Sequence, residues 1–165
     1  MKRNSQVTDQ VADGRLIALQ TGFQEIDQRR PSGIGTGVLW VVIPFTTPEL
    51  TRAALRHAGV CSDLDVQVAL VDIQVVPFPC PLDQPPINKE FSERRLRELL
   101  KESRLSGQAA VVYTRDWLEA FTRMLEPKSL VILPTQKRWW PTRQQKLARA
   151  LTKAGHQVML LPVAR

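Results

Sequence analysis

The hydrophobic positions of this chain follow two alternating patterns. Short, continuous apolar runs of the kind that form buried strands occupy residues 38–43, 66–76, 109–113, 130–133 and 158–161. Between them, apolar residues recur at helical spacing in segments that begin near residues 47, 88, 116 and 142. Strands that alternate with helices pair in parallel, so the pattern predicts an α/β fold with a five-stranded, parallel, doubly wound sheet in a three-layer sandwich.

Residues at the expected helix ends support this interpretation. The Thr-Pro-Glu triplet at residues 47–49 combines a capping hydroxyl, a first-turn proline and an acid near the positive end of the helix dipole. Asp116, with Glu119 three residues later, resembles a capping box. We expect the second helix to stop at Gly107 and the last helix to end with Gly155 as its cap.

Length and composition favour one domain with an N-terminal extension. The chain has 165 residues, of which 43% are hydrophobic, which is enough for one buried core. Residues 1–36 are polar and contain several glycines, so we assign them to a tail or linker and residues 37–165 to the α/β domain. No apolar run approaches the roughly 18 residues of a membrane span, and the basic start lacks a signal-peptide core. We therefore expect a cytoplasmic protein without a membrane partner.

Positive charge is concentrated towards the end of the chain. The formal net charge is +7, and no acidic residue follows Glu126. On the last helix, Lys146, Arg149 and Lys153 fall on one stripe. Arg143 lies at the border of this stripe. Such a stripe is either a solvated helix face or a site for a polyanion or an acidic partner.

The connection between the fourth strand and the last helix lies where sheets of this class bind ligands. Residues 134–141 follow the carboxyl end of that strand, but the chain has no glycine from Gln108 to Ala154. A phosphate cradle needs glycines because backbone N–H groups must approach the phosphate closely, so we expect no such cradle here.

Basic and aromatic residues occupy this connection instead. Adjacent residues in an extended segment point in opposite directions, so Trp139 and Trp140 are not expected to bury in one core. An exposed indole among cations suits a binding hot spot or a base-stacking platform, whereas the structural alternative is that both indoles cover the sheet edge. The candidate partner- or anion-binding residues are Lys137, Arg138, Trp139, Trp140, Arg143, Lys146 and Arg149.

The other candidate sites depend on single residues or pairs. His57 and Cys61 are four residues apart on one helical face and could share a metal, although such a pair is more often packing. Asp72 is either a buried acid of the second strand or marks the strand's end or an exposed face. We find no nucleophile elbow, paired carboxylates or zinc spacing. We therefore predict no enzymatic activity, no cofactor and no metal.

The order and spacing of these elements resemble the universal stress protein family over residues 38–163. The resemblance is carried by the strand leading into Thr47-Pro48-Glu49, by the Arg52-Ala53-Ala54-Leu55 helix, by Val75-Val76-Pro77, by Thr114-Arg115-Asp116-Trp117-Leu118-Glu119 and by the closing Val158-Met159-Leu160-Leu161-Pro162-Val163. It implies a sheet of the adenine nucleotide alpha hydrolase-like, flavodoxin-like type.

The chain also departs from that family at two hallmarks. ATP-binding members carry an acid at the end of the first strand, where residues 44–46 here read Pro-Phe-Thr. They also carry a glycine-rich run after the fourth strand, where this chain has residues 134–141. The resemblance therefore implies a divergent member that does not bind ATP. A degenerate nucleotide site that uses Lys137, Arg138 and Thr142 is the alternative at this loop.

These observations lead to two functional hypotheses. The first is a non-catalytic, homodimeric regulatory or interaction protein of the stress response, because members of the family commonly dimerise through their last strand. An exposed apolar strand at residues 158–161 would otherwise promote aggregation. The alternative is an anion-binding module for nucleotide or nucleic acid at the basic loop and last helix, whose binding would weaken with salt.

Overall fold

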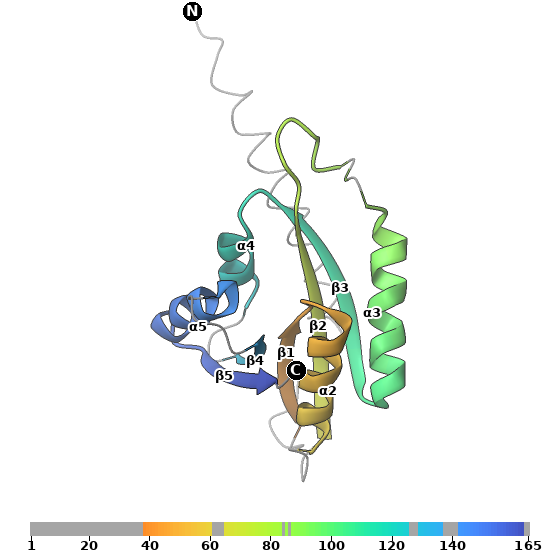
Figure 1. The fold of residues 1–165 in the computed structure, drawn as a ribbon, viewed down its shortest axis with the longest axis vertical. Coiled ribbons are helices and arrows are strands. Elements are labelled where there is room, and N and C mark those ends of the chain that lie inside the picture. The colour runs from red at the N-terminus through yellow and green to blue at the C-terminus, as the bar shows by residue number, and fades with distance from the viewer. Residues whose placement is uncertain are drawn as a thin grey trace, which may run out of the picture.

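The structure is a computed structural model that describes residues 38–60, 65–83, 85, 87–125, 129–136 and 142–163. Within these residues the chain alternates strand and helix (Figure 1). The strands are β1 (Val38–Pro44), β2 (Asp65–Val75), β3 (Ser106–Thr114), β4 (Leu130–Gln136) and β5 (Gln157–Val163). The helices are α2 (Pro48–Val60), α3 (Lys89–Ser103), α4 (Trp117–Met124) and α5 (Arg143–Lys153). None of these helices has the length and apolar character that a membrane crossing requires.

The five strands form one sheet in the order β3-β2-β1-β4-β5. Every neighbouring pair is parallel, so the predicted five-stranded, parallel, doubly wound sheet is confirmed. The order reverses direction between β1 and β4, which is the switch point where the carboxyl ends of strands open towards a ligand in sheets of this class. The edges of the sheet are β3 and β5.

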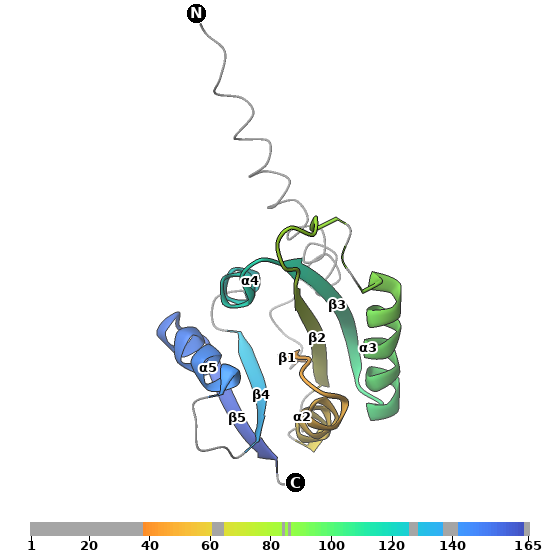
Figure 2. The same ribbon diagram turned by 45° about the horizontal axis from the view of Figure 1, so that its top comes forward.

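Helices cover both faces of the sheet, α2 and α3 on one and α4 and α5 on the other (Figure 2). In β2, Val68 and Leu70 join the core beneath α2 and α3, whereas Val71 and Ile73 join the core beneath α4 and α5. This double coverage explains why residues 68–71 form a continuous apolar run instead of alternating with polar residues.

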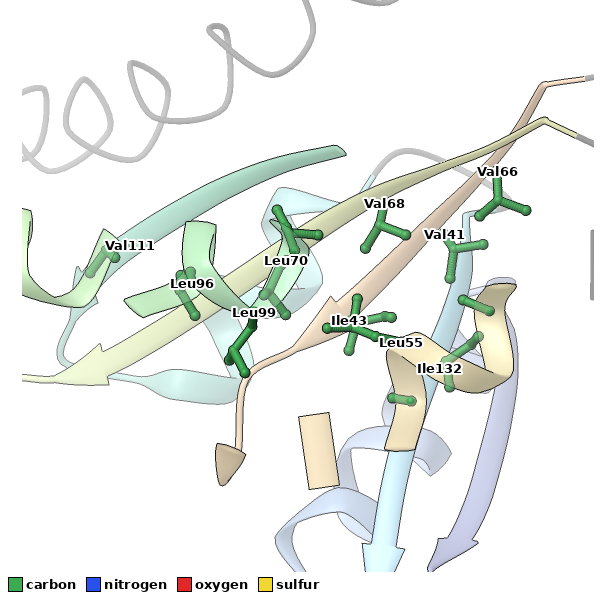
Figure 3. Close-up of a cluster of buried hydrophobic side chains, with 13 residues drawn as sticks. Val41, Ile43, Leu55, Val66, Val68, Leu70, Leu96, Leu99, Val111 and Ile132 are labelled. Atoms are coloured by element: carbon green, nitrogen blue, oxygen red, sulfur yellow. The ribbon is translucent and has the colours of Figure 1, made fainter. Parts of the chain in front are cut away.

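The core on the α2 side contains branched side chains from β1, β2, β3 and β4. Leu55 of α2 and Leu96 of α3 belong to one buried cluster with Val41, Ile43 and neighbouring strand residues (Figure 3). These side chains are fully or almost fully buried. Burying a Leu or Ile side chain stabilises a fold by about 1.5–3 kcal/mol, so this cluster holds the two helices to the sheet.

The expected helix starts and the last helix end are observed. The Asp116 carboxylate accepts a hydrogen bond from the Glu119 N–H at 2.8 Å and caps α4. After α5, Gly155 adopts a positive φ of 90°, which glycine reaches without strain. The capping signals in the sequence therefore located these ends correctly.

Two local expectations were wrong. Gly107 does not stop the second helix, because α3 ends at Ser103 with Arg104 in the left-handed region (φ 57°), and Gly107 lies inside β3. Residues 134–136 belong to β4 and not to the following loop. Both errors arise because continued pairing with a neighbouring strand extends β3 and β4 beyond their most apolar residues.

Candidate functional site

At the carboxyl end of β1, the chain caps the first turn of α2 with its own side chains. The Leu50 N–H donates to Thr47 Oγ1 at 3.4 Å, and the Thr46 N–H donates to Thr51 Oγ1 at 3.4 Å. Glu49 adds a carboxylate to this turn, and its pKa is lowered by a bond to its own backbone N–H and then by the Thr47 hydroxyl. A negative charge already lies where a bound phosphate would be attracted.

The N-terminus of α5 is closed in a similar way by a reciprocal capping box. Thr142 Oγ1 accepts a hydrogen bond from the Gln145 N–H at 3.3 Å, and Gln145 Oε1 accepts one from the Thr142 N–H at 3.0 Å. These bonds satisfy two backbone donors that an anion would otherwise use. A phosphate at this helix end would have to displace the cap.

Arg143, one of the predicted anion-binding residues, is held against α4. Its guanidinium carbon lies 4.1 Å from the centre of the Trp117 ring. Burial against the ring lowers the pKa of Arg143, and the nearby Asp116 carboxylate partly opposes that change. This cation–π contact joins the two helices that cover one face of the sheet.

Lys146 and Arg149 lie on the solvent face of α5, as does Lys153, so the predicted stripe is exposed. Among the described residues, no ion pair neutralises these three cations. The remaining predicted residues of the basic loop, Lys137, Arg138, Trp139 and Trp140, lie outside the described residues. Of the predicted set, the structure thus places Lys146 and Arg149 on an exposed positive face.

Asp72 lies within β2, where it is 7% exposed and forms an ion pair with Arg95 of α3. Arg95 Nη2 lies 3.2 Å from Asp72 Oδ2, and the Gln74 amide donates to the same oxygen at 2.9 Å. The Arg95 guanidinium also stacks 4.2 Å from the centre of the Phe45 ring. The buried-acid alternative is therefore confirmed, and the cluster joins α3 to the carboxyl ends of β1 and β2.

Sequence reasoning missed Arg95 as the partner of Asp72. The available signal was its position one residue before Leu96 and four before Leu99, since this spacing puts a cation beside the apolar face of α3. The Ser92 hydroxyl accepts a hydrogen bond from the Gln74 amide at 2.9 Å, so a polar strip continues beside the core.

The last strand, β5, has no buried side chain along its seven residues Gln157–Val163, although most of them are apolar. Met159 and Leu160 are 36% and 45% exposed. The opposite edge differs, because β3 buries Ala110, Val111 and Val112 beneath its helices. The apolar free edge of the sheet is therefore β5, and its outer backbone groups have no neighbouring strand among the described residues.

His57 of α2 contacts this edge strand. Its Nε2 lies 3.1 Å from the Sδ of Met159. Cys61, with which the sequence paired it, lies outside the described residues. Within the described part of the chain, no three His, Cys, Asp or Glu side chains gather as a metal site would require.

The solved structures that resemble this chain include the following two, whereas no protein-family model and no curated protein matches it. A protein of the universal stress protein family from Burkholderia pseudomallei aligns with a TM-score of 0.47 at 16% identity, over 79% of this chain and 99% of that chain. The eIF2B delta protein from Chaetomium thermophilum aligns with a TM-score of 0.41 at 15% identity, over 88% of this chain and 45% of that chain. Both TM-scores are low, so the fold class rests on the strand order described above.

Proposed function

We propose that this chain is a non-catalytic, universal stress protein-like module that acts as a homodimeric regulatory or interaction protein in stress response. The observation that carries the proposal is β5, an apolar strand at the sheet edge with no buried side chain. Such an edge is a template for another strand, and a second copy of the same strand is a self-complementary partner.

A two-fold axis perpendicular to the sheet would pair the β5 strands of two copies in antiparallel register. The pairing would continue the sheet across both subunits and would satisfy the outer backbone groups of β5 except opposite Pro162, which has no N–H to donate. Full overlap of Gln157–Val163 puts Leu160, the middle residue, opposite its own copy. A charge at this position would therefore face a like charge.

Sedimentation equilibrium of Leu160→Lys tests the dimer. We expect the wild type to sediment as a dimer and Leu160→Lys as a monomer. Leu118→Lys is the matched control, since Leu118 is 37% exposed on α4, far from the edge strand in sequence, and should leave the dimer unchanged. A monomeric wild type, or a Leu160→Lys variant that remains dimeric, contradicts the proposal.

The proposal also includes the absence of ATP binding. The caps at α2 and α5 and the Pro-Phe-Thr sequence at the end of β1 support it, because side chains already occupy backbone donors at both helix ends that face the switch point. Titration with labelled ATP at low and near-physiological salt should give no saturable signal. Saturable binding that persists at the higher salt would contradict this part of the proposal.

A second candidate function is a polyanion-binding module. The exposed cations of α5, which form no ion pair with any other described residue, favour it. A short single-stranded DNA should then bind at low salt and dissociate as salt rises. Lys146→Gln with Arg149→Gln should weaken binding, whereas Arg56→Gln with Arg94→Gln, which removes two exposed cations elsewhere, should not. Equal effects of the two double variants would indicate only non-specific attraction.

A further inference from the structure

His57 and Met159 come together from distant parts of the chain. His57 lies on α2 and Met159 on β5, 102 positions later, and the imidazole Nε2 is 3.1 Å from the thioether Sδ. His57 is half-buried, and 36% of Met159 is exposed. The pair therefore lies at the surface, on the α2 side of the free edge of the sheet.

An imidazole nitrogen beside a thioether sulfur is a donor pair for a soft cation. Thioether sulfur favours Cu(I) over hard cations such as Mg²⁺, and imidazole also suits copper. In a tetrahedral site with metal–nitrogen and metal–sulfur bonds of about 2.0 and 2.3 Å, the two donors are about 3.5 Å apart. The observed separation of 3.1 Å is close to that value. A thioether only accepts, so this contact is a hydrogen bond from Nε2–H to Sδ, and a metal would take the place of the Nε2 proton.

One protomer supplies only two such donors, and a tetrahedral site needs about four. The proposed dimer provides the others, and the inference rests on that dimer. A two-fold axis perpendicular to the sheet keeps each side chain on its own face, so both Met159 side chains lie on the α2 side. With Leu160 opposite its copy, the two Met159 residues are diagonal neighbours about 7–8 Å apart, within reach of long side chains.

We propose that the dimer binds one Cu(I) ion between the His57 Nε2 and Met159 Sδ atoms of both copies. The ion would lie on the two-fold axis and link the two subunits where their β5 strands meet. Binding would raise the apparent affinity of the subunits for each other, because the complete site exists only in the dimer.

The experiment must distinguish Cu(I) bound at His57 and Met159 from Cu(I) bound by the cysteine thiols. Cys61 follows His57 by four residues in the sequence, and Cys80 is a free, half-buried thiol. Thiolates bind Cu(I) tightly, so the full chain is prepared with Cys61→Ser and Cys80→Ser. This protein is titrated with Cu(I) in competition with a chromogenic chelator, and its association state is measured by sedimentation.

We expect one Cu(I) per two chains and a sulfur neighbour of copper in X-ray absorption spectra, which in this protein can come only from a thioether. Met159→Leu keeps the side-chain size, and it should remove the sulfur signal and weaken binding more than about tenfold while the apo protein remains dimeric. His57→Gln should weaken binding similarly. Met124→Leu is the matched control, because Met124 is buried in α4 and 6% exposed.

The possible failures are distinguishable. A dimer that binds no Cu(I), or that binds one ion per chain, overturns the shared metal site and leaves the dimer in place. Unchanged affinity in monomeric Leu160→Lys also overturns the shared site. A monomeric wild type in sedimentation contradicts the proposed function itself and removes the geometry on which the shared site depends.

Discussion

Asp72 shows that the burial of a residue determines how much its ion pair contributes to stability. Its carboxylate is nearly buried within a strand, and the Arg95 side chain that pairs with it is 37% exposed. The pair between Arg52 and Glu102 has a shorter distance of 2.9 Å, but these side chains are 44% and 54% exposed. Water screens the second pair and competes for its hydrogen bonds, so the longer but less exposed pair between Asp72 and Arg95 matters more for stability.

Replacing Asp72 with Asn should destabilise the protein by about 1–3 kcal/mol, because Arg95 loses its charged acceptor in a partly dehydrated position. Chemical denaturation with urea measures the change. Glu102→Gln, which breaks the exposed pair with Arg52, is the control and should leave the midpoint nearly unchanged. Equal losses in the two variants would show that burial does not distinguish the pairs.

The raised pKa of Tyr113 predicts how the stability of the protein changes at alkaline pH. Burial raises the pKa of its phenol above the usual value, and the carboxylates of Asp72, Glu90 and Glu93 raise it further. The folded protein therefore retains the phenol proton at a pH where the unfolded chain has lost it. Its contribution to stability is fully present below the usual phenol pKa of about 10 and is lost as pH rises through the folded-state pKa.

Tyrosinate absorbance measures this directly, since Tyr113 is the only tyrosine. The native protein should titrate at higher pH than the urea-unfolded chain. In Tyr113→Phe, the alkaline decline in unfolding free energy should be shallower, although the bond from the phenol to the Ile87 carbonyl at 2.9 Å is also lost. Coincident native and unfolded titrations would refute the raised pKa.

Among the elements, helix starts followed local rules and strand lengths did not. Thr142 and Asp116 cap their helices through side chains within a few residues, so sequence spacing alone located both helix starts. Gly107 was misassigned because it also suits a helix end. A glycine is required at this position because the backbone of β3 approaches β2 closely there. A Cβ atom on residue 107 would lie 2.3 Å from the Val68 carbonyl oxygen.

Gly107→Ala should therefore destabilise the protein by about 1–3 kcal/mol, since a methyl group at this position forces the two strands apart. Gly59→Ala is the matched change in α2, where the new Cβ would lie 3.6 Å from Leu105 Cδ2, an ordinary contact. It should stabilise the helix by about 0.5–1 kcal/mol. Thermal unfolding of the two variants in parallel checks the opposite signs, and equal shifts would contradict the close approach.

At the scale of the whole molecule, the two edges of the sheet differ in how well they are covered. Helices bury the middle of β3, whereas β5 presents apolar side chains and an open backbone. The same part of the chain carries the exposed cations of α5. Both proposed modes of interaction therefore involve the half of the fold built from β4, α5 and β5.

Dimerisation through β5 predicts that thermal stability depends on protein concentration. A partner that binds only the folded chain raises the unfolding temperature by mass action. The midpoint should rise with concentration for the wild type and for Leu118→Lys and should be constant for Leu160→Lys. A midpoint independent of concentration in the wild type would argue against a dimer that dissociates as it unfolds.

The sequence by itself determined the succession of strands and helices, the helix starts and the exposure of the basic stripe. These features depend on periodicity and on contacts between residues a few positions apart. It left open whether Asp72 was buried, did not reveal Arg95 as its partner, and paired His57 with Cys61 and not with Met159. Only the tertiary structure decided the strand order, the contacts that form across it and which apolar edge stays free, because these depend on residues far apart in the chain that periodicity does not connect.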